Sequence, residues 1–102
     1  MRIIKEKFLR EAAADYPKAA QYLAAWARIV RQASWRHLAD VRRTYPGADL
    51  ALVSSGKPVI VFNVCGNTYR LIVAIHFDRQ MAYTLRFLTH AHYSKDTWKG
   101  EL

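Results

Sequence analysis

The sequence predicts a single α+β domain, with helices in its first half and a mainly antiparallel sheet in its second half. Up to residue 44, apolar side chains recur every three or four residues, as on amphipathic helices. Beyond residue 50 the apolar spacing changes to two, as on half-buried strands. The 102 residues are 52% hydrophobic and 24% charged, which suits one modest core and is too short for two. We therefore expect one domain over residues 1–102.

Two helices that form a hairpin are expected before residue 34. Residues 5–14 are good helix formers, and Tyr16-Pro17 ends this run because proline suits the first turn of the next helix. The second helix has an apolar stripe at helical spacing: Tyr22, Leu23, Trp26, Ile29, Val30 and Ala33. Ser34 is a candidate N-cap for a further short helix that Tyr45-Pro46-Gly47 ends. The predicted architecture is an N-terminal helical hairpin packed on the sheet.

Four strands are expected after these helices. Residues 51–54 are a weak candidate, whereas residues 59–64 are a β-branched run followed by the tight-turn pair Gly66-Asn67. Residues 68–77 and 81–90 form two longer strands, and a polar and aromatic tail follows them.

Register determines which face of this sheet is functional. Each long strand has one apolar face, and we expect both faces to turn toward the helices. These side chains are Tyr69, Leu71, Val73, Ile75 and Phe77 in one strand, and Met81, Tyr83, Leu85 and Phe87 in the other. A two-residue turn at Gly66-Asn67 sets Asn63 opposite Arg70. We therefore expect Asn63, Arg70, Arg86 and His90 to converge on the opposite, polar face.

Basic residues predominate in the chain. Sixteen Lys and Arg face eight Asp and Glu, which gives a formal net charge of +8. Arginine offers a planar fork that matches phosphate, and a small basic domain is typical of nucleic-acid binding. Solubility or an acidic partner would also explain the charge. Arg28 and Arg31, on the polar side of the second helix, are candidate contacts to RNA, although solvation explains them as well.

The residue inventory also limits the chemistry. The few carboxylates are not paired in sequence as a metal-dependent nuclease or a glycosidase would require, and phosphate-loop, dinucleotide and CxxC motifs are absent. His90 and His92 would share a strand face, but no carboxylate accompanies them to orient metal ligands. We therefore expect no metal and no cofactor, and catalysis by Arg, His, Tyr and Lys.

The expected location is the cytoplasm. The single cysteine, Cys65, suits a reducing compartment. The N-terminus has no signal-like apolar region, and no apolar run is long enough to span a membrane. We expect no contact with a membrane.

Several polar side chains are candidates for binding or catalysis. Arg70 and Arg86 lie in mid-strand, where arginine is costly unless its face is solvated or binds an anion such as phosphate. His90 is a candidate acid or base because histidine titrates near neutrality, and a structural role is the alternative. In the tail, Tyr93 could stack on a base or move a proton, and Lys95 could bind phosphate. Docking of the tail on the core would equally explain its aromatic residues.

Two segments resemble the HigB toxin family. Residues 61–71, VFNVCGNTYRL, resemble its FNVGGNxYRL block, and residues 89–93, THAHY, followed by Trp98-Lys99, resemble its THxEYD…WK ending. The helices ahead of the sheet and Tyr16-Pro17 between them agree with the same family.

The resemblance implies a RelE-like fold of the RelE–ParE superfamily and a toxin of a bacterial type II toxin–antitoxin system. It implies a ribosome-dependent mRNA endoribonuclease, or mRNA interferase, that cuts mRNA in the ribosomal A site without a metal. The ribose 2′-hydroxyl would attack the adjacent phosphate. The expected partners are mRNA, ribosomal RNA and a HigA-type helix-turn-helix antitoxin.

Residue roles follow from this resemblance together with the inventory above. The catalytic candidates are Arg70, His90 and Tyr93. The candidates for RNA or phosphate binding are Asn63, Arg86, Lys95, Arg28 and Arg31. Two alternatives share the scaffold or the charge: a ParE-like toxin that inhibits DNA gyrase and cuts nothing, and a non-catalytic RNA-binding module.

Overall fold

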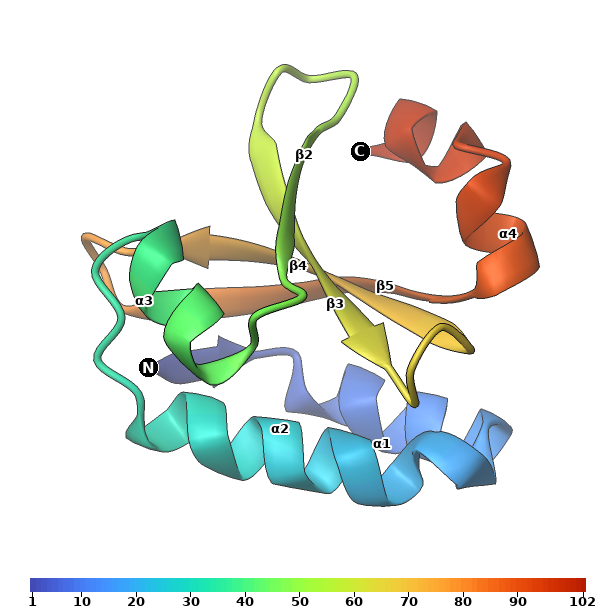
Figure 1. The fold of residues 1–102 in the computed structure, drawn as a ribbon, viewed down its shortest axis with the longest axis horizontal. Coiled ribbons are helices and arrows are strands. Elements are labelled where there is room, and N and C mark those ends of the chain that lie inside the picture. Colours follow the sequence, from blue (N-terminus) through green and yellow to red (C-terminus); the bar gives the residue numbers. More distant parts are fainter.

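A computed structural model describes residues 1–102 as a five-stranded sheet with helices packed around it (Figure 1). The helices are α1 (Glu6–Asp15), α2 (Ala20–Gln32), α3 (Leu38–Thr44) and α4 (His90–Ser94), with 3-10 turns at Pro17–Ala19 and Thr97–Glu101. The strands are β1 (Arg2–Ile4), β2 (Asp49–Leu52), β3 (Pro58–Val64), β4 (Tyr69–His76) and β5 (Met81–Thr89). The predicted α+β class is confirmed. None of the helices has the length and apolar character needed to cross a membrane.

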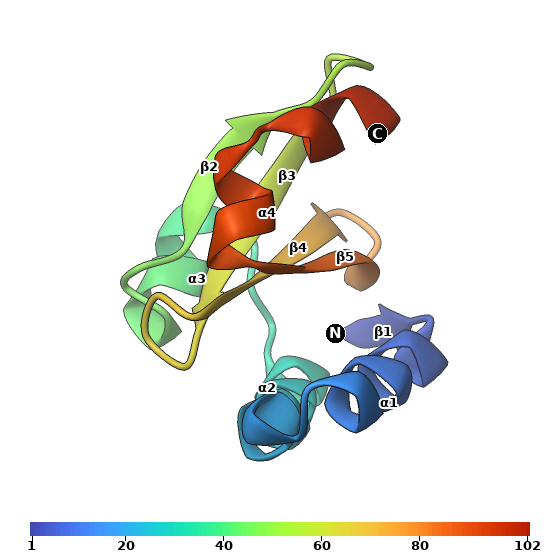
Figure 2. The ribbon, with the colours of Figure 1, turned by 90° about the vertical axis from the view of Figure 1, so that its right-hand side faces the viewer.

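The strands lie in the order β1-β5-β4-β3-β2, and only β1 and β5 run parallel. Figure 2 shows α1 and α2 together on one side of this sheet, and α4 with the C-terminal segment on the other. The predicted helical hairpin on a mainly antiparallel sheet is therefore confirmed.

Each face of the sheet carries its own core. The larger core packs α1 and α2 on the sheet, and its fully buried side chains include Trp26, Val30, Phe62, Leu71 and Val73. The smaller core, on the opposite face, is closed by Trp98 of the C-terminal segment and contains Val53, Val59, Val61, Ile72 and Leu88. Because β4 contributes to both cores, its side chains are fixed on both faces. The tail therefore docks on the face opposite the hairpin.

Strand β1 is an addition to the predicted elements. It pairs with the start of β5. The α-amino group of Met1 donates hydrogen bonds to the carbonyls of Val30, Arg31 and Ala33 at 3.0, 3.2 and 2.7 Å. These carbonyls lie at the C-terminal end of α2, where a positive charge is favourable. Three residues are too few to leave a periodic signal in the sequence.

The start of α3 differs from the prediction. The helix begins at Leu38, and Ser34 does not cap it. Instead, the carboxylate of Asp40 accepts a hydrogen bond of 2.9 Å from the backbone N–H of Arg36. This bond is the main cause that holds the pKa of Asp40 below its usual value; desolvation opposes it, and the neighbouring His37 and Arg43 act in the same direction as the bond.

Because β5 contains a β-bulge, the prediction of which side chains face the helices is wrong for the first part of this strand. The pairing of β4 with β5 shifts between Ile72, opposite Arg86, and Val73, opposite Thr84, which leaves Leu85 as an extra residue. Beyond the bulge Phe87 packs toward the helices as expected, but before it Ala82 takes that side. Leu85 joins the smaller core instead. An inserted residue breaks the two-residue alternation, and nothing in the sequence marks it.

Candidate functional site

The turn between β3 and β4 brings the first two site residues together. Asn63 pairs with Arg70 across these strands, as predicted. The connection is a four-residue turn over residues 65–68, with φ of 53° at Cys65 and 68° at Gly66. A positive φ is free for glycine and costs energy at other residues. The register prediction is confirmed, although the turn is longer than the expected two residues.

Asn63 and Arg70 line an open hollow of about 410 Å³ on the face opposite α1 and α2. Its other polar side chains are Arg42 from α3, Asp49 from β2 and Tyr93 from α4. The remaining lining residues are Pro46, Gly47, Ala48 and Val61. Segments far apart in the sequence thus build one concave and mostly cationic surface.

Arg70 is the buried cation of this hollow. Only 8% of its surface is exposed. Its Nη1 donates to the carbonyl of Tyr69 at 3.0 Å and its Nη2 to Oδ1 of Asn67 at 3.3 Å. No carboxylate forms an ion pair with it, although seven ion pairs exist in the molecule. A buried charge is costly unless it is paired, so this guanidinium favours an anionic ligand.

Tyr93 and Trp98 support the guanidinium. The Arg70 Cζ lies 5.3 Å from the centroid of the Tyr93 ring, a cation–π contact. The Tyr93 ring stacks on Trp98 with centroids 5.5 Å apart and 19° between planes. Trp98 is fully buried, and its Nε1 donates to the carbonyl of Tyr93 at 3.1 Å. Because the Tyr93 ring already contacts Arg70 and Trp98, the group that Tyr93 can offer a ligand is its hydroxyl.

Gly47 makes room for Asn63. A Cβ on Gly47 would lie 2.9 Å from Nδ2 of Asn63, closer than real Cβ contacts. A larger residue at position 47 would therefore push the Asn63 amide aside. The sequence predicts only a helix end at Pro46-Gly47, so this contact with Asn63 was not predicted. The places of Arg42 and Asp49 in the hollow were not predicted either. The signal for Gly47 was its place beside a helix end, but no sequence pattern pointed to the other two.

Arg86 does not converge with Arg70, contrary to the prediction. The side chain of Arg86 instead pairs with Glu101, whose Oε1 accepts from Nε at 3.2 Å. It lines a separate hollow beside α1, together with Glu11 and Asp15. Arg86 lies opposite Ile72, in unbroken register with the pairing of Arg70 and Leu88, so the bulge does not separate the two arginines. The Glu101 carboxylate instead holds the Arg86 side chain near the C-terminus.

His90 also lies outside the lining of the hollow. It begins α4 instead of ending a strand, and its side chain is exposed. The backbone N–H of His90 donates a hydrogen bond of 3.0 Å to the carbonyl of Thr68. Tyr93 follows three residues later, which puts both side chains on the same side of α4. His90 is thus near the rim. Because this segment is helical, His90 and His92 do not share a face, and no three His, Cys, Asp or Glu side chains gather as in a metal site.

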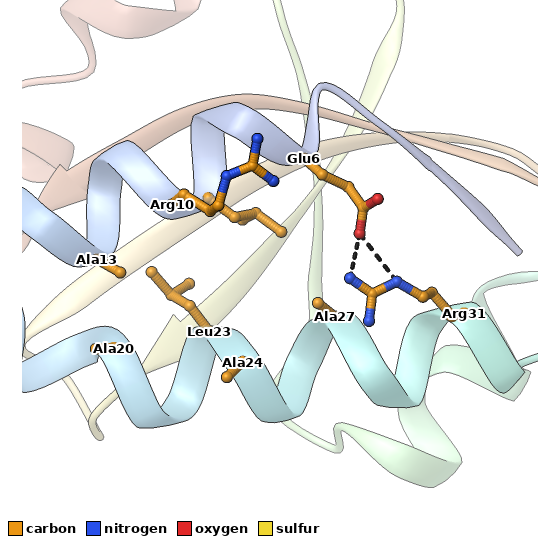
Figure 3. Close-up of a pocket in the computed structure, with 9 residues that line it drawn as sticks. Glu6, Arg10, Ala13, Ala20, Leu23, Ala24, Ala27 and Arg31 are labelled. Carbon is orange, nitrogen blue, oxygen red and sulfur yellow. Dashed lines mark hydrogen bonds and ion pairs between the residues drawn. The ribbon is translucent and has the colours of Figure 1, made fainter.

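The remaining candidates lie elsewhere on the surface. Lys95 is exposed just after α4, and Arg28 is exposed on α2. Arg31 has a partner, because its Nε donates to Oε1 of Glu6 at 2.9 Å and so ties α2 to α1. Figure 3 shows this pair beside a groove of about 280 Å³ between the two helices. Arg28 and Arg31 therefore belong to the helical layer and not to the hollow.

Fold and site together define a class: a small basic α+β domain with a buried arginine that has no acidic partner. Residues 19–96 match the sequence profile of the HigB toxin family, described as the RelE-like toxic component of a toxin–antitoxin system. The chain belongs to this family, as the segments at residues 61–71 and 89–93 indicated.

Curated relatives agree with this assignment. The chain is similar to the mRNA interferase toxin HigB of Escherichia coli strain K12, and to the mRNA interferases HigB of E. coli O157:H7 and Shigella flexneri. Each is 27% identical over 93 residues, which cover 91% of this chain and 88% of the relative. The family match over residues 19–96 includes every residue that lines the hollow.

Proposed function

We propose that this chain is an mRNA endoribonuclease, the toxin of a type II toxin–antitoxin pair, and that it cuts mRNA on the ribosome without a metal. Family membership and the name of its relatives, mRNA interferase, support this proposal. The observation that carries it is Arg70, a buried guanidinium without an acidic partner in an open hollow. A phosphate diester is the anion that suits such a fork.

The proposed reaction is attack of a ribose 2′-oxygen on the adjacent phosphorus. A bond forms between the 2′-oxygen and phosphorus, and the bond from phosphorus to the 5′-oxygen breaks. The products are a 2′,3′-cyclic phosphate and a 5′-hydroxyl. Negative charge grows on the non-bridging oxygens during the reaction, and Arg70 stabilises that charge.

Two proton transfers accompany this step. The 2′-hydroxyl loses its proton, and the leaving 5′-oxygen gains one. We assign these transfers to His90 at the rim and to the hydroxyl of Tyr93, which share one side of α4. Imidazole suits this work because it titrates near neutral pH. Asn63 contacts the same nucleotide from the neighbouring strand.

The proposed partners are mRNA in the ribosomal A site, ribosomal RNA and a HigA-type antitoxin. The net charge of +8 favours an RNA environment. Lys95, Arg28 and Arg86 are exposed or partly exposed cations away from the hollow, and we assign them to RNA backbone outside the reacting nucleotide.

Cleavage mapping tests the proposed function. A defined mRNA is incubated with the purified chain, free or on ribosomes with an empty A site, and cuts are mapped by primer extension. We expect cuts only with ribosomes, with 2′,3′-cyclic phosphate and 5′-hydroxyl ends. Cuts on free RNA that EDTA abolishes would contradict metal independence. No cuts, together with loss of DNA supercoiling by gyrase, would contradict the nuclease altogether.

A further inference from the structure

We propose that Arg42 of α3 binds a second phosphate of the RNA, next to the one at Arg70, and that Asp49 holds the Arg42 guanidinium when RNA is absent. This inference rests on the proposed function, because it extends the same site along the RNA strand. Arg42 and Arg70 line one hollow, together with Asn63 of β3, the strand next to β4.

Arg42 is fixed in direction but open to a ligand. Its Nε donates a hydrogen bond of 2.9 Å to the carbonyl of Ala48, which anchors one edge of the guanidinium to the loop after α3. The two terminal nitrogens remain for other partners. Its side chain is 47% exposed, so a phosphate can reach them from solvent.

Asp49 is a weak and replaceable partner. Its Oδ1 lies 3.6 Å from Nη2 of Arg42, beyond hydrogen-bond distance, and its side chain is 72% exposed. The same oxygen accepts a 3.0 Å bond from the backbone N–H of Leu50, which keeps the carboxylate near the hollow. Exposed ion pairs contribute little stability. An RNA phosphate presents two oxygens to the fork of the Arg42 guanidinium. Unlike Oδ1 of Asp49, these oxygens are not already bonded to the N–H of Leu50, so the phosphate displaces Asp49 from Arg42.

The adjacent residue, Arg43, is a matched control. It lies on the same helix and forms an ion pair of equal length, 3.6 Å from Nη1 to Oδ1 of Asp40, with an 82% exposed side chain. Arg43 does not line the hollow. Arg42→Ala and Arg43→Ala therefore change the net charge equally, and only the first removes a cation from the site.

The experiment measures binding and cleavage separately. Binding uses a short single-stranded RNA with 2′-O-methyl groups, which cannot be cut, titrated at several salt concentrations. Cleavage uses single-turnover reactions on ribosome-bound mRNA. The variants are Arg42→Ala, Arg43→Ala and Asp49→Asn, with thermal unfolding of each as a check of folding.

We expect Arg42→Ala to weaken binding about tenfold at low salt and to reduce the salt slope by about 0.7, the value for one phosphate contact on a single strand. In the cleavage reaction, we expect the concentration needed for half-saturation to rise by a larger factor than the maximal rate falls. Arg43→Ala changes binding less than about twofold, as expected for an exposed ion pair. Asp49→Asn tightens binding, because a competing carboxylate is lost.

Equal effects of Arg42→Ala and Arg43→Ala would overturn the proposal, and weaker binding by Asp49→Asn would overturn the role of Asp49. These results are distinct from failure of the proposed function. If the wild-type chain binds the RNA through Arg42 but never cuts, the phosphate site stands and the nuclease does not. If the wild-type chain neither binds nor cuts, both fall together.

Discussion

At the scale of single residues, Arg70 differs from the other arginines that have defined partners. Arg31, Arg42, Arg43 and Arg86 each pair with a carboxylate. Arg70 is buried and has no such pair. The sequence places both Arg70 and Arg86 in mid-strand, and the ion pair that draws Arg86 away could not be predicted because its partner, Glu101, lies 15 positions further along the chain. The pairing of Asn63 with Arg70 was predictable, since a short turn fixes it.

Substitution of Gly47 tests whether the position of the Asn63 side chain matters for mRNA cleavage. A methyl group at Gly47 meets the Asn63 amide, so Gly47→Ala is expected to move that amide and lower mRNA cleavage severalfold with little loss of stability. Because both changes act on one side chain, Gly47→Ala combined with Asn63→Ala is expected to match Asn63→Ala alone. The measurement is kcat/KM for the three variants. Additive losses would show that Gly47 acts through another group.

At the scale of elements, the helices and long strands follow from periodicity. The expected helix over residues 5–14 is α1, shifted by one residue, and the strand expected over residues 59–64 is β3, longer by one. The C-terminal segment was less predictable. THAHY alternates in a manner that suits a strand, yet Thr89 caps α4 with its hydroxyl, which accepts from the N–H of His92 at 3.2 Å. This cap, at the end of β5, decides in favour of the helix.

Trp98 is the anchor of this C-terminal segment. Its side chain is fully buried in the smaller core and stacks on Tyr93. We expect Trp98→Ala to lower the free energy of unfolding by about 3–5 kcal/mol, the usual cost of removing a buried aromatic side chain. Trp98→Phe keeps a ring under Tyr93 and is expected to cost less. Urea unfolding measures both, and an effect of Trp98→Ala below about 1 kcal/mol would contradict an anchoring role.

At the scale of the whole molecule, both faces of the sheet carry a buried core, and only one of them also carries the hollow. Helices α1 and α2 cover one face of the sheet, and the C-terminal segment covers the other (Figure 2). The hollow is on the face of the C-terminal segment. The α+β class, the family and the pairing of Arg70 with Asn63 could be predicted, because they depend on local periodicity and on residues 61–71. The contributions of Arg42, Gly47 and Asp49 could not, because they reach the site only through tertiary packing.

The central claim is that Arg70 serves ligand binding and not folding, and Arg70→Met tests it most directly. Methionine fills similar space without an unpaired buried charge, so the free energy of unfolding is expected to stay equal or to rise. Cleavage of ribosome-bound mRNA is expected to fall by about 100-fold or more, as when a donor to a developing oxyanion is removed. Both quantities are measured on the same preparation. Retained cleavage, or a loss of about 2 kcal/mol or more in stability, would contradict the account.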